Sequence, residues 1–359
     1  MPSPDGPKRG TIIPFPAAAI RRPPSPAFVT QPVPATRVPA RGRVVLAWFA
    51  LASLITGLLA AFLLSFAASS AAHHRGAPPR AAEALRSTVP GSVNLLIAGL
   101  DANEGSPDGS AARSDAIMLL HLDADREQAW VVSIPRETRV TVPGHGERRI
   151  DAVCALGGSS LLVTTVQRLT RLPVDHVAVI DRTGFRRITD GVGGVPLNLG
   201  PASPADPGPR PGGLAFELSG AMALDYVSEP GASPAGDVEH IRREHRYLRA
   251  LFAQLRERGT LADSPALRDL AASLGGSVRV DTGLDAATLR SLVESTKELR
   301  PEDVTFLVAP VRATRPPGGV TVVRPDAAGC AQLWDALAHD EMPSLVAAHP
   351  DLVSAGTEP

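Results

Sequence analysis

The fold of this chain is decided by one stretch, "RSDAIMLLHLDADREQAWVVSIPRETRVTVPGHGERRIDA", which runs from Arg113 to Ala152. Two apolar runs, "AIMLLHLD" and "AWVVSIP", are separated in it by the polar sequence "DADRE". Apolar runs of this kind, bounded by turn residues, are typical of core strands. We therefore predict a hairpin of two buried strands.

Charged residues stand at the open end of this predicted hairpin. Arg113 and Asp115 come at the start of the first strand. Arg136 and Glu137 follow the second strand. In a hairpin the start of one strand and the end of the next meet at the same edge, so these charges are expected to gather there. They are either solvated strand ends or parts of a binding site.

Strands and helices alternate through the rest of the sequence. "SVNLLIAGLD", "VDHVAVID", "TFLVAPVRA" and "GVTVVRPD" predict further strands. "GGSSLLVTTVQRLTRL" predicts a helix capped by Ser159 or Ser160, and "RTGFRRITDGVGGV" a short one closed by glycine. "SGAMALDYVSE" predicts a helix from Ser219, and "DVEHIRREHRYLRALFAQLRERG" a long amphipathic one that ends at Gly259. This order predicts an α/β fold (an α+β sandwich) with a central mixed β-sheet flanked by helices.

We predict one folded domain over residues 91–340 and a C-terminal tail over 341–359. Residues 1–43 are proline-rich and carry seven Lys or Arg against one acid, which predicts a disordered basic arm. Residues 44–66, "VVLAWFALASLITGLLAAFLLSF", contain no charge and are long enough to cross a hydrocarbon core of about 30 Å. Residues 67–90 have the small, polar composition of a stalk.

The uncharged segment predicts a single transmembrane helix in the cell membrane. Its basic flank comes first, which places the N-terminus in the cytoplasm and the folded domain outside the membrane. A cleavable signal peptide is the alternative, but the apolar run is longer than the usual 7–15 residues or so. The net charge of −1 hides a basic arm on an acidic body. That distribution argues against nucleic acid as a partner of the body.

Two cysteines occur, Cys154 and Cys330. In an exported domain they form either one disulfide or two buried free thiols, and the sequence leaves both open. No Cys/His pattern has the spacing of a zinc site.

Acidic residues at strand ends are the candidates for a metal site. Asp101 ends the strand "SVNLLIAGLD", and Asp115 opens the next one. If the two strands are neighbours, both carboxylates meet at one edge, and two such ligands with a substrate phosphate suit Mg²⁺. The alternative is that both residues merely bound loops. Arg113, Arg136 and Arg149 stand at similar edges, where guanidinium groups suit phosphate or form surface ion pairs.

Four blocks occur in one order: "NLLIAGLD", "RSDAIMLLHLD", "SIPRETRVTVPGHGERRIDAVCALGG" and "LPVDHVAVIDRTGFRRITDGVGGV". In this order they closely resemble the LytR-CpsA-Psr family, over roughly residues 91–255. The resemblance implies a membrane-anchored phosphotransferase of the bacterial cell wall. Such an enzyme moves a phospho-glycopolymer from a polyprenyl-pyrophosphate lipid to peptidoglycan, with Mg²⁺ as cofactor and the lipid tail in an apolar pocket.

The resemblance also implies roles for individual residues. Asp101 and Asp115 match the Mg²⁺-linked acids, and Arg113 belongs to the same "RSD" block as Asp115. Arg136 matches the pyrophosphate-binding arginine after "IP". Arg149, in the same block as Arg136, stands where the family usually has Lys, and Asp237 and Arg243 match a block on the later helix. The resemblance implies that all three bind substrate.

The second half of the family pattern departs from expectation. Ser228 and Pro230 stand where the resemblance predicts two arginines after "ALDYV". His240 and Glu244 stand where Arg and Gln are usual. Two hypotheses follow: a phosphotransferase with an altered arginine set, or a catalytically weak or inactive membrane-tethered protein that binds polyprenyl-linked wall intermediates.

Overall fold

The computed structural model describes residues 89–102, 113–198, 215–229, 236–257, 274–296, 298–314 and 321–354. The predicted cytoplasmic arm, the transmembrane segment and almost all of the stalk lie outside the described residues. The boundaries proposed for them stay predictions.

A mixed six-stranded sheet forms the centre of the fold, with the strand order β10-β3-β2-β1-β6-β9. β1 pairs antiparallel with β2 and parallel with β6, while β3 pairs antiparallel with β2 and parallel with β10. β9 pairs antiparallel with β6 at the other edge. The strands are β1 (Val93–Leu100), β2 (Ser114–Leu122), β3 (Ala129–Ser133), β6 (His176–Asp181), β9 (Val278–Val280) and β10 (Val304–Val308). The predicted central mixed sheet is confirmed.

The predicted hairpin is formed by β2 and β3, in a register that places Leu122 opposite Ala129 and Met118 opposite Ser133. β1 pairs with β2, as the sequence analysis had considered. Beyond the last paired residues, the backbone N–H of Asp101 donates to the carbonyl of Arg113 at 2.9 Å. The end of β1 and the start of β2 therefore lie at the same edge of the sheet.

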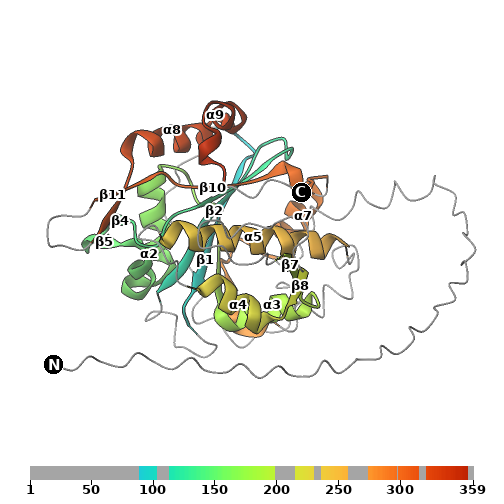
Figure 1. Cartoon of the computed structure of the whole chain (residues 1–359). Coiled ribbons are helices and arrows are strands. Elements are labelled where there is room, and N and C mark those ends of the chain that lie inside the picture. The colour runs from blue at the N-terminus through green and yellow to red at the C-terminus, as the bar shows by residue number, and fades with distance from the viewer. Residues whose placement is uncertain are drawn as a thin grey trace, which may run out of the picture. The chain divides into compact units, whose positions relative to one another are not determined.

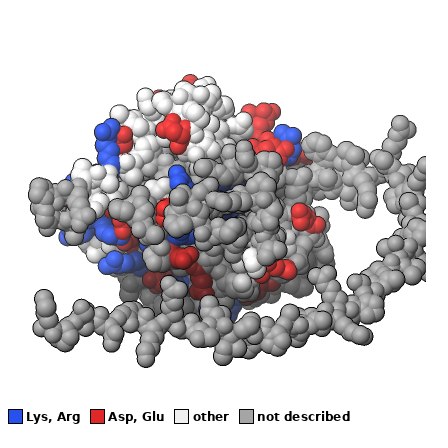
Figure 2. Space-filling view, in the orientation of Figure 1, with Lys and Arg blue, Asp and Glu red and all other residues white. Residues whose placement is uncertain are grey.

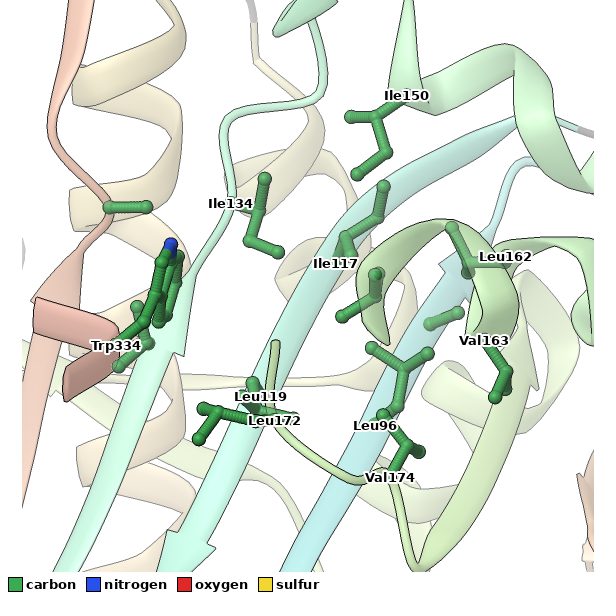
Figure 3. Packing of buried hydrophobic residues seen from close by; sticks show 14 of the residues in the cluster. Leu96, Ile117, Leu119, Ile134, Ile150, Leu162, Val163, Leu172, Val174 and Trp334 are labelled. Atoms are coloured by element: carbon green, nitrogen blue, oxygen red, sulfur yellow. The ribbon is translucent and has the colours of Figure 1, made fainter. Parts of the chain in front are cut away.

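Side chains of successive residues on the central strands enter two different cores, as the two-residue period of a strand requires. Leu96, Ile117 and Leu119 belong to one buried cluster, and Leu95 and Met118 belong to the other. Both faces of the sheet are therefore covered, which explains why β1 and β2 read as continuous apolar runs. Figure 3 shows Leu96, Ile117 and Leu119 packed together with residues from the α2 segment and with Trp334.

Helices cover the two faces of the sheet. Figure 1 shows α5 running across the sheet, with α3 and α4 side by side next to it and with α8 and α9 close together elsewhere. The helices are α2 (Val153–Thr170), α3 (Arg182–Gly191), α4 (Gly220–Ser228), α5 (Gly236–Glu257), α7 (Ala286–Thr296), α8 (Ala327–Ala338) and α9 (Met342–Ala348). Short 3₁₀ segments are η3 (Ile150–Ala152), η4 (Gly275–Ser277), η5 (Pro301–Asp303) and η6 (Pro350–Leu352).

Two helices begin directly after a residue whose side chain accepts a hydrogen bond from the first turn. The Ser219 hydroxyl accepts from the backbone N–H of Met222, and the Asp181 carboxylate accepts from that of Gly184, so each residue caps its helix. The sequence predicted a helix that begins at Ser219, and in the structure Ser219 is the residue just before it. α2 starts earlier than predicted, at Val153, and the backbone breaks at Gly157 and Gly158 just before the predicted start.

Three small two-stranded sheets complete the fold. They pair β4 (Arg139–Val142) with β5 (Gly146–Arg149), β7 (Val195–Asn198) with β8 (Ala215–Leu218), and β11 (Val311–Thr314) with β12 (Val322–Pro325). The β4–β5 and β7–β8 pairs were not predicted, because short strands outside the core carry little apolar pattern.

The folded part extends past residue 340. Met342 at the start of α9 is fully buried, and Ser354 donates its backbone N–H to the carbonyl of Phe306 at 2.9 Å. Cys154 and Cys330 are both buried free thiols, so the free-thiol alternative is confirmed. Among the described residues, the helical segment Ile150–Thr170 is long and apolar enough to cross a membrane. Half of it is buried against the sheet, as in a core helix.

Candidate active site

The edge of the sheet where β1 and β6 end and β2 begins gathers charged residues from three segments. The register places Leu100 opposite Asp181 on one side and opposite Ser114 on the other. Asp101 Oδ1 lies 2.9 Å from Nε of Arg182, the first residue of α3. The backbone segments that carry Asp101 and Asp115 therefore lie at the same edge of the sheet, while the metal role predicted for the two carboxylates stays a prediction.

Arg136 reaches the same edge from the segment that follows β3. Its Nη1 donates to Oδ1 of Asp115 at 2.9 Å, and both side chains are about one-third exposed. A half-buried guanidinium paired with a carboxylate at a rim can exchange that partner for a phosphate oxygen, which has the same bidentate acceptor geometry.

A second charged group surrounds Asp151, whose carboxylate is almost fully buried. Arg149 Nη2 donates to it at 2.8 Å, and Arg113 Nη1 lies 3.7 Å from it. The backbone N–H of Asp151 donates to the carbonyl of Arg136 at 3.2 Å, which joins the two charged groups. Arg149 also lies 3.4 Å from Glu137, so the predicted ion-pair alternative describes Arg149 in this structure.

Basic and acidic side chains lie next to one another on the face shown in Figure 2. This mixture agrees with the ion pairs described above and differs from the one-sign stripe typical of nucleic-acid binding.

Arg243 does not join the charged edge in this structure. Its side chain is buried, and its Nη2 donates to the backbone carbonyl of Glu229, which follows the end of α4. Asp237 lies in the first turn of α5, and its side chain is outside the described part of the chain. The predicted roles of both residues stay predictions.

An apolar pocket opens at the charged edge and continues between the sheet and the helices α3, α4 and α5. We call it the sheet–helix pocket. Its apolar lining includes Ile97, Met118, Ile180, Phe185, Leu224 and Leu248. Its polar lining consists of Asp115, Asp181, Arg182, Ser228, His240, Glu244 and Tyr247. Most of these polar residues sit at strand or helix ends, so the pocket is polar at the edge and apolar inside.

His240 and Glu244 are neighbours on α5, one turn apart, and both are buried. His240 Nε2 lies 3.0 Å from Glu244 Oε1. Neither ring nitrogen makes a well-aligned hydrogen bond to a described residue, and both nitrogens are inaccessible to water. Deeper in the pocket, the Tyr247 hydroxyl bonds to Thr189 Oγ1 at 2.7 Å, and burial raises the pKa of Tyr247 above its ordinary value.

A buried contact fixes α5 relative to the segment that carries Arg136. Ser133 Oγ lies 2.8 Å from Nε2 of His245, and both residues are fully buried. Burial, assisted by the charge of Arg249, lowers the pKa of His245 to about 3, so its ring is neutral. The contact therefore couples the helix to the end of β3 without adding charge.

The two acids at the edge have the oxygen ligands that a magnesium ion prefers. Asp101 and Asp115 each use Oδ1 in an ion pair, and each carboxylate remains partly exposed to solvent. Two carboxylates that leave oxygen atoms accessible suit an ion that keeps several water ligands and completes its shell with phosphate oxygens.

Another group of possible ligands lies at the opposite end of β2. One atom each of His121, Asp123 and Asp340 lie within 4.8 Å of one another. Protein groups already bond to them: His121 Nδ1 lies 2.8 Å from Asn94 Oδ1, and Trp130 Nε1 donates to Asp123 Oδ1 at 2.9 Å. Burial and the nearby charge of Asp340 raise the pKa of Asp123 to about 7.

The sequence prediction missed Arg182 as a residue of the edge. Arg182 follows the strand "VDHVAVID", which forms β6. Because β6 is parallel to β1, the ends of both strands lie at the same edge of the sheet, and the reasoning that placed Asp101 there also places Arg182 there. What the sequence could not supply was the position of β6 beside β1. His240 and Glu244 stood out only as departures from the family pattern, with no indication that they face a pocket.

Comparisons with known proteins place the chain among cell wall proteins of one family. The model of the LytR-CpsA-Psr family matches residues 61–339. The TagU protein of Halalkalibacterium halodurans, named a polyisoprenyl-teichoic acid–peptidoglycan teichoic acid transferase, is 30% identical over 193 residues, which cover 54% of this chain and 62% of that protein. The cell wall biosynthesis protein LcpA of Corynebacterium glutamicum is 30% identical over 226 residues, which cover 55% of this chain and 43% of LcpA. The chain thus spans less than two thirds of either relative.

Solved structures share the fold. A structure described as TagT bound to LI-WTA superposes with a TM-score of 0.57 at 20% identity and covers 75% of this chain and 100% of its own. The crystal structure of B. subtilis TagV gives a TM-score of 0.56 at 21% identity, with 70% and 97% covered.

Proposed function

Because this chain belongs to the LytR-CpsA-Psr family, we propose that it is a membrane-anchored transferase that moves a phospho-glycopolymer from a polyprenyl-pyrophosphate carrier to peptidoglycan. The single observation that carries the proposal is the sheet–helix pocket, which is apolar inside and charged at its mouth. An amphiphile with a hydrocarbon tail and an anionic head has the same polarity pattern.

The lipid tail would occupy the apolar part of the pocket. Ile97, Met118 and Leu248 come from both walls, so a hydrocarbon chain between them would lose its contact with water on both sides. Each buried methylene contributes about 0.8 kcal/mol. Affinity from the tail would leave the charged edge free to act on the phosphates.

The pyrophosphate would lie at the charged edge. Arg136 and Arg182 would exchange their present carboxylate partners for phosphate oxygens, and Asp101 and Asp115 would hold Mg²⁺. A bound Mg²⁺ neutralises phosphate charge that develops during transfer. Phosphoryl transfer depends mainly on positioning and charge neutralisation. Arg136 would contribute to positioning as well as to charge neutralisation, because the contact between Ser133 and His245 fixes the chain just before it.

The reaction is a displacement at phosphorus. A hydroxyl oxygen of the peptidoglycan acceptor forms a bond to the phosphorus that bears the glycopolymer, and the bond from that phosphorus to the bridging oxygen breaks. The leaving group is polyprenyl phosphate, and the proton of the acceptor hydroxyl passes to it or to solvent. The predicted anchor over residues 44–66 would keep the domain at the outer surface of the cell membrane, where such a lipid and the wall are both accessible.

A second candidate function is a binding protein for polyprenyl-linked wall intermediates. It is favoured by the rim near α4, where Ser228 is exposed and Arg243 bonds to a backbone carbonyl. Fewer arginines then remain to stabilise a transition state, although the apolar pocket for the tail is unaffected.

A transfer assay separates the two. The full chain in lipid nanodiscs would receive a polyprenyl-pyrophosphate-linked glycan and peptidoglycan, with and without Mg²⁺. The transferase predicts Mg²⁺-dependent release of polyprenyl phosphate and attachment of the glycan to peptidoglycan. Saturable binding of the lipid without release would establish the binding protein instead, and absence of both would refute both functions.

A further inference from the structure

A surface groove lies between α4 and β8, outside the sheet–helix pocket, and we call it the α4–β8 groove. β8 precedes α4 in the chain, and the two elements lie side by side (Figure 1). Ser228 at the end of α4 lines both the groove and the sheet–helix pocket. The described residues that line the groove are Leu218, Met222, Asp225, Tyr226, Ser228 and Glu229. The groove therefore leads to the mouth of the pocket, where the transfer is proposed to occur.

Large apolar side chains are exposed along this groove. Met222 is 49% exposed and Phe216 is 44% exposed. Phe216 precedes Leu218 by two residues on β8, so their side chains lie on the same face of that strand and Phe216 extends the apolar side of the groove. Among the described residues, the third large apolar side chain exposed to this degree is Leu156 on α2. Exposed apolar residues that gather beside polar ones are typical of binding surfaces, whereas a single exposed residue is not.

The polar groups of the groove are carboxylates and hydroxyls. Asp225 and Glu229 are exposed acids, and Ser228 is an exposed alcohol. Tyr226 adds a phenol that stays neutral, because burial raises its pKa. Neither Lys nor Arg occurs among the lining residues that the structure describes. A surface of this charge repels phosphate, so it does not suit the head group of the donor.

A neutral sugar chain matches these groups. Carboxylate oxygens accept hydrogen bonds from sugar hydroxyls, and the phenol of Tyr226 both accepts and donates. The apolar surface of Phe216 and Met222 suits the C–H faces of sugar rings, which lose contact with water on binding. An anionic lipid surface is a poor alternative, because it attracts basic residues and the groove is acidic.

We propose that the α4–β8 groove binds the glycan strand of the peptidoglycan acceptor and brings its hydroxyl to the mouth of the sheet–helix pocket. This inference rests on the proposed function, because it locates the acceptor of the proposed transfer. Donor and acceptor would occupy adjoining surfaces of different character. The pocket would take the lipid, while the acidic groove would take uncharged sugar rings and repel the phosphates of a second donor.

Binding of an uncharged sugar tests the groove without requiring transfer. A β-1,4-linked tetrasaccharide of N-acetylglucosamine is titrated into the full chain in lipid nanodiscs, and saturation-transfer NMR gives the dissociation constant. Met222→Ser removes exposed apolar surface, and Glu229→Gln removes a carboxylate. Leu156→Ser is the matched control, because it removes a similarly exposed apolar side chain from α2.

Met222→Ser and Glu229→Gln are each expected to weaken binding of the tetrasaccharide about three- to tenfold, the size of one lost apolar or polar contact. Leu156→Ser should bind it as the wild type does. In the transfer assay, the two groove variants should raise the KM for peptidoglycan by a similar factor and leave kcat and the KM for the lipid donor unchanged.

A wild type that transfers glycan but does not bind the tetrasaccharide would overturn the inference and leave the proposed function intact. Sugar binding that neither groove variant weakens would do the same. A change in oligomeric state caused by Met222→Ser, with unchanged sugar affinity, would assign the groove to contact between two copies of the chain and also overturn it. Absence of both lipid binding and release would refute the proposed function, and with it the acceptor role of the groove, even if sugar binding persisted.

Discussion

Nη1 of Arg136, in the segment after β3, lies 2.9 Å from Oδ1 of Asp115 at the start of β2. This pair joins the two charged ends of the hairpin that the sequence predicts. In the proposed reaction this ion pair separates, because the guanidinium of Arg136 binds phosphate and the carboxylate of Asp115 binds Mg²⁺.

Arg136→Ala is expected to reduce transfer about 10- to 150-fold, because a charge-assisted hydrogen bond contributes about 1.5–3 kcal/mol. The release of polyprenyl phosphate measures this loss. Arg300→Ala is the matched control, since Arg300 forms an exposed pair with Asp303 on η5. Equal rates for the two variants would remove Arg136 from the site.

Asp115→Asn should raise the Mg²⁺ concentration needed for half-maximal transfer by about tenfold or more, because the amide is a weaker ligand than a carboxylate for a hard cation. Titration of the rate with Mg²⁺ gives this concentration. An unchanged Mg²⁺ requirement would favour the strand-end interpretation, in which Asp115 serves only as the partner of Arg136.

Arg182→Ala tests the residue that sequence reasoning missed. Loss of its guanidinium should weaken the binding of a polyprenyl pyrophosphate about tenfold, within the range of a single charge-assisted contact. The stability of the fold should change by less than about 1 kcal/mol, because its pair with Asp101 is exposed. Lipid binding and thermal unfolding, measured on the same sample, separate the two effects. Undiminished lipid binding would exclude Arg182 from the head-group site.

Ser228→Arg should strengthen donor binding, because Ser228 lines the mouth of the pocket and is exposed. One added charge-assisted contact predicts up to about tenfold tighter binding. Pro230 lies outside the described residues, so Ser228 is the sharper test. A variant that binds no better than the wild type would mean that the end of α4 points its side chains away from the phosphates.

Asp123→Asn tests the buried network at the far end of β2. The pKa of Asp123 is about 7 in the folded chain, against about 3.9 when unfolded. The folded state therefore retains a proton that the unfolded state releases, and this contribution to stability is full below about pH 4 and lost as pH rises to about 7.

Above pH 7 the variant should be more stable than the wild type by about 4 kcal/mol, since an amide avoids the buried charge and its oxygen can still accept from Trp130. Urea unfolding at pH 5 and pH 8 measures the difference. A variant that is destabilised equally at both pH values would show that the Asp123 proton does not control this network.

The sequence predicted those parts of the fold in which local pattern and burial agree. β1, β2, β3 and β6 are apolar on both faces, so each appeared as a continuous run. The start of α4 was predicted to within one residue, because the Ser219 side chain favours a helix start. The β4–β5 and β7–β8 pairs were missed, because short surface strands depend on tertiary contacts. For the site, Asp101, Asp115, Arg113 and Arg136 were expected at one edge, and the structure places them there. The positions of Arg182 and His240 could not be predicted, because they depend on the strand order and on the packing of α5. Both are set by long-range contacts.

The most direct test of the central claim follows the phosphorus atom. A donor carrying ³²P in the phosphate attached to the glycan would be incubated with the full chain, Mg²⁺ and peptidoglycan. The proposed function predicts that the label enters peptidoglycan in step with the release of unlabelled polyprenyl phosphate, and that Arg136→Ala suppresses both. Label that stays on the lipid despite saturable binding, or that appears only as soluble phospho-glycan, would contradict a glycopolymer transferase.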